Sequence, residues 1–246
     1  TLNVIKKGSI GLAESYMAGE FETNNLSNLI ELTARNIDVV HQFSGILDFS
    51  TVNYLKNNFL KNTRKRSKEN IAKHYDLGNE FFSLWLDKTL TYSSAIFDKE
   101  DQKLEEAQQN KYEKLTNLLS PKNGNKLLEI GCGWGGFAEF AAKKYHINIT
   151  CITLSRKQAE YAQKRVQKEG LSDLIDIKIS DYREINKKYD KIISIEMFEA
   201  VGKKYWPIFF QKLYDNIKDN GIIGMQLISI KDDLYSSYKY NTDFIQ

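Results

Sequence analysis

The stretch Leu127–Gly136, which reads LLEIGCGWGG, constrains the fold of this chain more than any other part of its sequence. Its first apolar residues are typical of a short buried strand, and the glycines that follow are typical of a turn. The helical pattern FAEFAAKKY comes directly afterwards. Glycines bring bare main chain close to a ligand, and the free N–H groups of the next helix attract a polar or anionic group. The stretch therefore predicts a strand, a turn and a helix around a nucleotide-like ligand.

Two kinds of nucleotide ligand suit this turn. Gly131–Gly136 satisfies the G-x-G-x-x-G pattern of dinucleotide sites. However, Glu129 lies two residues before the first glycine, where a carboxylate suits the ammonium group of S-adenosylmethionine better than a pyrophosphate. A dinucleotide site also expects an acidic residue about 20 residues further on, and the segment CITLSRKQ has none. The sequence favours S-adenosylmethionine. An NADP-dependent oxidoreductase is the alternative, because Arg156 and Lys157 offer partners for the NADP phosphate.

Composition excludes several other classes of protein. The 246 residues are 41% hydrophobic and 27% charged, with a net charge of +3, which is ordinary for a globular protein with a real core. No run approaches the roughly 18 apolar residues of a membrane span, and no signal peptide is evident, so we expect a cytoplasmic protein. Cys132 and Cys151 have no other metal-ligating residues at suitable spacing and are interpreted as core residues, so no metal site is expected. Because the chain opens without methionine, we expect a fragment of a longer protein.

The chain before the glycine turn divides into two predicted segments. Residues 1–60 carry apolar residues at helical spacing, as in LSNLIELTARNIDVV, and predict a small helical domain without catalytic residues. Residues 61–98 open with a basic run, interpreted as a solvated linker or as a contact with anionic lipid headgroups. No recognition motif supports nucleic acid. The aromatic stretch that follows, up to Phe97, predicts a lid over the ligand.

Residues 99–246 show the regular alternation of an α/β fold. Strands that alternate with helices of this length imply a parallel sheet covered on both faces. Ligands of such sheets gather at the carboxyl ends of the strands. Glu129, Thr153, Asp181 and Glu196–Glu199 follow predicted strand ends, so we expect them to converge on one pocket. The predicted strands are Lys126–Ile130, Asn148–Thr153, Ile175–Ile179, Lys191–Ile195 and Ile222–Ile228, and the predicted helices are Asp101–Leu119, Gly136–Tyr145, Ser155–Glu169 and Lys203–Lys218.

The helix predicted at Asp101–Leu119 is amphipathic and precedes the first strand. Its apolar side chains recur at helical spacing, which indicates the face that packs on the sheet. The expected inward residues are Leu104, Ala107, Tyr112, Leu115 and Leu118.

Six motifs occur in a familiar order: HYDLGNEFF, TYSSAIF, LLEIGCGWGGFAEFAA, TLSRKQAEYA, SDYRE and EMFEAVG. The chain resembles the cyclopropane-fatty-acyl-phospholipid synthases and mycolic acid cyclopropane synthases, which are S-adenosylmethionine-dependent methyltransferases. The resemblance runs from about residue 70 to the end, and more weakly back to Gly8. It implies a Rossmann-like class I methyltransferase domain with a doubly wound sheet that is truncated at its C-terminus.

The resemblance also implies which residues hold S-adenosylmethionine. The lid side contributes a Tyr-Ser pair, the glycines hold the methionine part, and later segments hold the ribose and the adenine. Glu129, inferred above from its position, joins this set. The expected cofactor-binding residues are Tyr92, Ser93, Glu129, Gly131, Gly133, Gly135, Thr153, Leu154, Gln158, Asp181, Tyr182 and Ile195.

The implied reaction adds a methylene group to the cis double bond of an unsaturated fatty acyl chain of a phospholipid. The alkene attacks the cofactor's methyl group, and the resulting carbocation loses a proton to close a ring. The resemblance implies a bicarbonate ion as the base, with Glu199 orienting it. Ser94 and Gln226 complete the expected catalytic set by hydrogen-bonding the anion. Apolar walls must exclude water from the cation.

Three positions depart from the cyclopropane synthases. Ser94 replaces a cysteine, Ala200 a histidine and Gln226 another histidine. These changes leave two alternatives open: C-methylation that gives methylene- or methyl-branched chains without a ring, and a lipid-binding module without catalysis. The resemblance further implies transient contact with a membrane, a peripheral location at the inner membrane face, and a possible homodimer.

Overall fold

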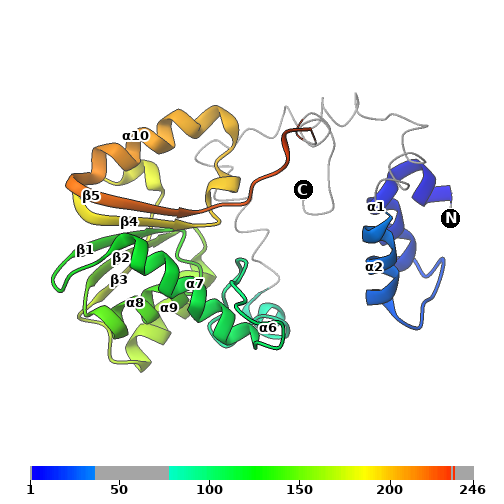
Figure 1. Cartoon of the computed structure of the whole chain (residues 1–246), viewed down its shortest axis with the longest axis horizontal. Coiled ribbons are helices and arrows are strands. Elements are labelled where there is room, and N and C mark those ends of the chain that lie inside the picture. Colours follow the sequence, from blue (N-terminus) through cyan, green and yellow to red (C-terminus); the bar gives the residue numbers. More distant parts are fainter. Residues whose placement is uncertain (1, 37–77, 234, 236–246) are drawn as a thin grey trace. The chain divides into compact units, whose positions relative to one another are not determined.

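The computed structural model of the chain describes residues 2–36, 78–233 and 235 (Figure 1). Two compact units are present: residues 1–61 with 230–246, and residues 62–229. The predicted basic linker lies outside the described residues, and the domain boundaries expected from the sequence remain a prediction.

The N-terminal unit contains helices α1 (Leu2–Met17) and α2 (Leu26–Arg35). A backbone break at Gly8, with φ of 57°, kinks α1. The side chain of Asn25 caps α2 by accepting a hydrogen bond from the N–H of Asn28. Helices therefore form where the sequence predicted them, although the apolar face of α2 is not buried within the described residues.

The second unit is built on a sheet of parallel strands in the order β3-β2-β1-β4-β5. Three central strands are almost wholly buried, which explains why their sequences read as unbroken apolar runs. Strand order reverses beside β1, between β2 and β4, which is where ligands of such sheets bind. The strands are β1 (Lys126–Ile130), β2 (Asn148–Thr153), β3 (Ile175–Ile179), β4 (Tyr189–Ile195) and β5 (Ile217–Gln226).

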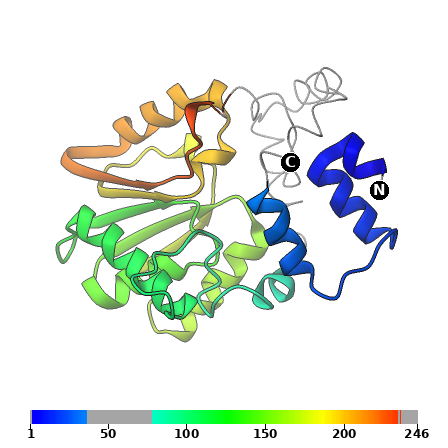
Figure 2. The same cartoon turned by 45° about the vertical axis from the view of Figure 1, so that its right-hand side comes forward.

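Helices cover both faces of the sheet, as Figures 1 and 2 show. One core packs α7 (Leu104–Leu119), α8 (Gly136–Tyr145) and α9 (Arg156–Lys168) against the strands. A second core places α10 (Trp206–Asn216) on the other face. The predicted α/β, doubly wound class is confirmed.

The last helix and strand differ from the prediction. Helix α10 is shorter than Lys203–Lys218, because a separate 3-10 turn (η3, Lys203–Tyr205) precedes it. Strand β5 starts five residues earlier than expected and includes the KDNG segment. The pairing with β4 shifts register between Tyr189 and Lys191, and Asn220 has φ of 62°. A strand irregularity thus accommodates residues whose composition is typical of a turn.

Helix α7 turns a partly polar face inward. Tyr112, Leu115 and Ala107 are buried as expected, but Leu104 is 38% exposed and Leu118 is 70% exposed. Gln108 and Lys111 are buried instead. The buried face of α7 is therefore rotated from the face that the apolar pattern indicates, and it carries two polar side chains.

The lid begins with the short helix α6 (Gly78–Ser83) and continues as a loop into α7. Arg165 on α9 fixes this loop by donating hydrogen bonds to the carbonyls of Lys88 (3.0 Å) and Thr89 (2.7 Å) and to that of Trp134 (2.9 Å). A guanidinium that ties three carbonyls together holds the lid against the glycine turn.

Candidate active site

The glycine turn is held open by its own backbone. Gly131, Gly133 and Gly135 have φ of 83°, 53° and 82°, values that side-chain-bearing residues rarely adopt. The N–H groups of Gly131 and Cys132 both donate to the carbonyl of Ile152, at 2.9 and 3.1 Å, which pins the turn to β2. A Cβ added to Gly133 would meet nothing within 4 Å. Bare main chain thus borders open space at the carboxyl end of β1, as a ligand lying on it requires.

Glu129 is a buried carboxylate beside this turn. It is 3% exposed and accepts a hydrogen bond from the thiol of Cys151 at 3.4 Å. Burial raises the pKa of Glu129 to about 8, and the charge of Lys111 opposes that shift only in part. A buried carboxylate with so weak a hydrogen bond is suited to a cationic ligand group.

The end of β2 and the start of α9 present ordered polar groups. The hydroxyl of Thr153 donates to the side-chain oxygen of Gln158 at 3.0 Å, and both residues are buried. Leu154, next to them, is half-buried. Ser155 caps α9 by accepting a hydrogen bond from the Gln158 N–H at 3.3 Å. The expected ribose-side residues therefore lie together as one hydrogen-bonded unit.

Asp181 follows β3 and is 1% exposed. Arg183 donates to both of its carboxylate oxygens, at 2.8 and 2.5 Å, and this pairing is bidentate. Tyr182 packs edge-on against Phe209 at 5.2 Å, and burial raises the pKa of its hydroxyl. The expected adenine-side pair is thus rigidly held, although Arg183, which holds it, was not predicted.

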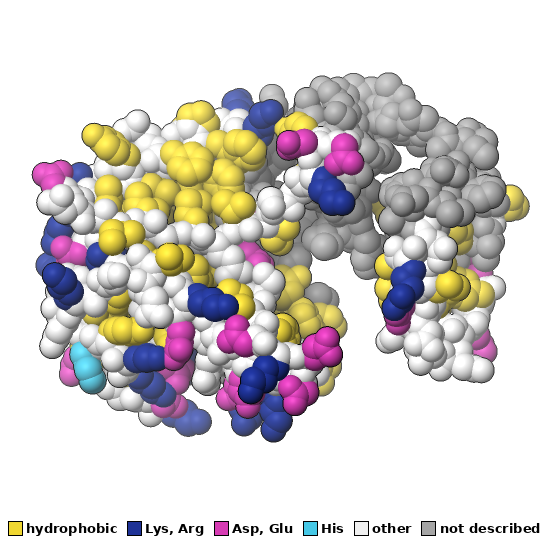
Figure 3. All heavy atoms as spheres, viewed as in Figure 1, with side chains coloured by type: hydrophobic (Ala, Val, Ile, Leu, Met, Phe, Trp, Pro, Cys, Tyr) yellow, Lys and Arg dark blue, Asp and Glu magenta, His cyan; other side chains and the backbone are white. Residues whose placement is uncertain are grey.

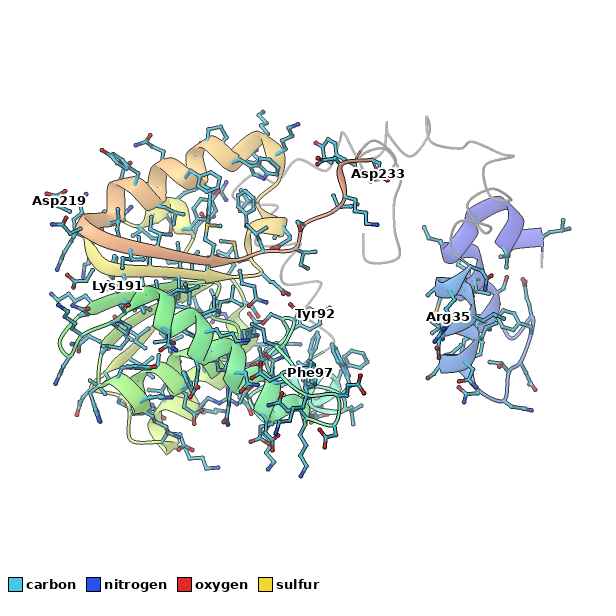
Figure 4. All side chains as sticks on the ribbon, viewed as in Figure 1. Arg35, Tyr92, Phe97, Lys191, Asp219 and Asp233 are labelled. Carbon is cyan, nitrogen blue, oxygen red and sulfur yellow. The ribbon has the colours of Figure 1, made fainter. Side chains whose placement is uncertain are left out.

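The lid contributes an aromatic cluster at the same end of the sheet. Tyr92 packs edge-on against Phe82 and Trp85, each at 5.4 Å. In Figure 4, Tyr92 and Phe97 lie at the end of the sheet opposite Lys191 and Asp219. The predicted lid residue therefore sits on the carboxyl side of the strands.

Ser93 is held by helix α7. Its hydroxyl accepts a hydrogen bond from the Lys111 ammonium at 2.6 Å, and its carbonyl accepts one from the Gln108 amide at 2.8 Å. Burial lowers the pKa of Lys111 to about 8, although Glu196, Asp87 and Glu129 oppose the shift. A buried lysine thus links the lid to the acidic groups of the site.

Ser94 and Gln226 lie together, and the carboxylate between them is that of Glu196. Its Oε1 atom accepts hydrogen bonds from the Ser94 N–H (3.0 Å), the Ser94 hydroxyl (2.5 Å) and the Gln226 amide (2.8 Å). Glu199 lies in the 3-10 turn η2 (Phe198–Ala200), is exposed, and accepts a hydrogen bond from the N–H of Ile228. Ile195, the last residue of β4, is half-buried against the core.

Sequence reasoning missed Lys111 and left Glu196 out of the named site residues. Lys111 lies one turn from Gln108 and Leu115 on the buried face, but the apolar pattern of the helix does not include it. Glu196 directly follows β4, and Glu199 follows three residues later. Only the backbone geometry shows which of the two carboxylates faces Ser94 and Gln226.

The fold and the glycine turn define the class as a Rossmann-like S-adenosylmethionine-dependent methyltransferase domain. Residues 62–246 match the family described as "Mycolic acid cyclopropane synthetase". The chain belongs to this family. The match leaves the NADP-dependent interpretation without support.

Individual relatives agree with this assignment. The chain is 40% identical to the probable fatty acid methyltransferase of Pseudomonas putida over 68% of its own length and 43% of the relative's. It is 36% identical to the cyclopropane-fatty-acyl-phospholipid synthase of Escherichia coli K12, over 93% of its length and 58% of the relative's. The chain thus spans about half the length of these curated relatives.

A solved relative extends the comparison to ligands. The mycolic acid cyclopropane synthase CmaA1, complexed with SAH and CTAB, matches with a TM-score of 0.62 and 33% identity, over 64% of this chain and 55% of that one. That complex shows a member of the family with SAH bound. Within residues 2–36 and 78–233, no helix is long and apolar enough to cross a membrane.

Proposed function

We propose that the protein transfers the methyl carbon of S-adenosylmethionine to the cis double bond of an unsaturated fatty acyl chain of a phospholipid, with cyclopropane formation as the outcome. The observation that carries the proposal is the buried carboxylate of Glu129 beside the glycine turn, whose main chain borders open space at Gly133. That pairing suits an ammonium group and a nucleoside on one ligand. The names of the relatives supply the acyl substrate.

The residues present fit S-adenosylmethionine. Glu129 would take the ammonium group, the unit of Thr153 and Gln158 the ribose, and Asp181 with Tyr182 the adenine. When bound, the cofactor supplies an electrophilic methyl group on a sulfonium. Tyr92 and Ser93 close the site from the lid, which excludes water that would otherwise quench a carbocation.

The lid also suits a cationic reaction. Aromatic faces stabilise a nearby positive charge by roughly 0.5–2 kcal/mol each. Tyr92, Phe82 and Trp85 provide three rings within 6 Å of one another. We expect these rings to border the hydrocarbon chain and the developing cation.

A bicarbonate base fits the site less well. The donors that would hold it, Ser94 and Gln226, are already engaged by the carboxylate of Glu196. A second anion would face that carboxylate at close range, and Glu199 lies elsewhere. We derive no step through bicarbonate.

The acyl substrate implies a membrane surface. We propose that the protein works as a peripheral protein at the inner membrane face and takes its substrate directly from the bilayer. Hydrophobic side chains gather over α10 and β5 (Figure 3), where Ile208, Phe210 and Tyr214 are exposed. A homodimer is part of the proposal and would show in the mass of the protein in solution.

Branched products are the second candidate, because Ser94 and Gln226 replace the family's cysteine and histidine and a relative is a probable fatty acid methyltransferase. Analysis of lipids from cells that express the full-length protein distinguishes cyclopropane formation from branching. Proton NMR shows upfield cyclopropyl signals if a ring forms. Mass spectrometry shows chains longer by one carbon without those signals if branching occurs. Unaltered lipids in cells that contain the folded protein would refute both and favour a lipid-binding module.

A further inference from the structure

The contact between Ser94, Glu196 and Gln226 joins three distant parts of the chain. Ser94 belongs to the lid, Glu196 follows β4, and Gln226 ends β5. Besides its bond to Glu196, the Gln226 amide donates to the carbonyl and the hydroxyl of Ser94, at 3.2 and 3.0 Å. The backbone N–H of Glu196 donates to the Gln226 carbonyl at 2.9 Å. The carboxylate is therefore fixed by side-chain and main-chain bonds together.

The backbone at Glu196 is unusual. Its φ of 46° lies in the left-handed region, which costs a residue with a side chain roughly 1–2 kcal/mol. Such a conformation persists only where the surrounding structure imposes it, and it is concentrated at functional sites. Here it turns the chain directly after β4, so that the carboxylate points at the lid.

Glu196 also adjoins the cofactor turn. A Cβ added to Gly131 would lie 2.7 Å from the side chain of Met197, the next residue after Glu196. The segment that carries the carboxylate is thus packed against the main chain on which the cofactor is proposed to lie. This contact places the acidic group beside the glycine turn.

The hydrogen bonds of Glu196 leave one of its carboxylate oxygens available. Within the described part of the chain, all three hydrogen bonds to its carboxylate reach Oε1, which leaves Oε2 for the substrate. The Lys111 ammonium, bound to Ser93, interacts favourably with Glu196. An oriented carboxylate with one available oxygen is the arrangement that a general base requires.

We propose that Glu196 is a catalytic residue, the built-in base that takes the place of a bound bicarbonate. The proposal rests on the proposed function. The alkene's π electrons form a bond to the methyl carbon, and the carbon–sulfur bonding pair leaves with sulfur. A C–H bond of the resulting cation then breaks. Its electrons form the ring bond, or the new double bond of a branched product, and the proton goes to Glu196, which returns it to water at its half-exposed side.

The test uses purified full-length protein, S-adenosylmethionine with a labelled methyl group and vesicles of unsaturated phospholipid. Glu196→Gln keeps the size of the side chain and removes its basicity. We expect it to lower product formation at least a hundredfold while the Kd for S-adenosylmethionine changes less than threefold. The exposed Glu100→Gln is the matched control and should keep full activity. Retained activity in Glu196→Gln would overturn the proposal.

A second experiment tests whether the reaction depends on bicarbonate. Wild-type activity should not change when bicarbonate is stripped from the buffer. The Glu196→Gly variant suits the positive φ and leaves the hydrogen-bond donors of Ser94 and Gln226 free to bind an anion. Added bicarbonate should therefore raise the activity of this variant at least tenfold. A wild type that needs bicarbonate, or a Glu196→Gly variant that it cannot rescue, would overturn the role of Glu196. If the wild type transfers no label under any condition, the proposed function itself fails, which is a distinct result.

Discussion

The two halves of the candidate site are built differently. The cofactor half, at the ends of β1, β2 and β3, consists of buried groups such as Glu129 and Asp181. The acceptor half, at the ends of β4 and β5, consists of the exposed Ser94 and the half-buried Glu196 and Gln226. The first half is part of the core and is preformed. The second depends on the lid staying in place over two strand ends.

The two halves differ in what a substitution is expected to cost the folded protein. A carboxylate that is buried next to a strand costs stability unless its ligand is bound. Partly exposed groups carry a smaller cost, so we expect substitutions at positions such as 94 and 226 to leave the protein folded. The predictions below test the contrast, starting with the largest effect.

Glu129→Gln should break the cofactor half. It removes the charge that would pair with the cofactor's ammonium group, so we expect the Kd for S-adenosylmethionine to rise by about a hundredfold, as for a lost charge-assisted hydrogen bond in a buried site. Isothermal titration calorimetry measures this directly. Glu160→Gln, on the exposed side of α9, is the control and should bind normally. Equal affinity in both variants would show that Glu129 does not meet the ligand.

The same variant should make the free protein more stable at high pH. Glu129 ionises near 4.5 when unfolded and near 8 when folded. The folded state therefore holds an extra proton between these values, and stability falls as pH rises through that window. The variant's gain in free energy of unfolding over the wild type should be absent below pH 4.5. It should grow by about 1.4 kcal/mol per pH unit between pH 4.5 and 8 and level off above pH 8. Urea unfolding at pH 6 and 8.5 measures it. If the difference in free energy of unfolding between the variant and the wild type does not grow from pH 6 to pH 8.5, burial does not penalise the ionised form of Glu129.

Lys111→Met should weaken the link between the halves. It removes the hydrogen bond to Ser93 and the favourable charge near Glu196. We expect product formation to fall by about tenfold, the scale of one lost bond to a charged group, with little change in cofactor affinity. Lys114→Met, exposed on the same helix, serves as the control. A loss confined to cofactor binding would place Lys111 in the cofactor half instead.

Arg165→Lys should give the smallest effect. Lysine lacks the planar fork that reaches three carbonyls, so the lid should loosen while the core stays folded. We expect a loss of about 1–2 kcal/mol in stability and faster amide exchange at residues 88–94. Hydrogen exchange followed by mass spectrometry resolves this region. Unchanged exchange there would mean that other contacts hold the lid.

The same contrast separates what the sequence revealed from what it did not. The cofactor half follows from local order: an apolar strand, glycines and a helix determine where Glu129 and the glycines lie. The Ser94–Gln226 contact spans 132 residues and depended on the family resemblance. The resemblance made bicarbonate the base and Glu199 the residue that orients it, and the sequence alone does not reveal the left-handed turn at Glu196. Lys111 was missed because its burial depends on how α7 is rotated on the sheet.

The central claim is that a methyl group passes from the cofactor half to an acyl double bond in the acceptor half. The direct measurement incubates the full-length protein with S-adenosylmethionine carrying a labelled methyl group, and with vesicles of either unsaturated or fully saturated phospholipid. Mass spectrometry then locates the label. The account predicts label within the unsaturated acyl chains and none in the saturated lipid. Label in the headgroups, or no transfer by a protein that binds the cofactor, would contradict it.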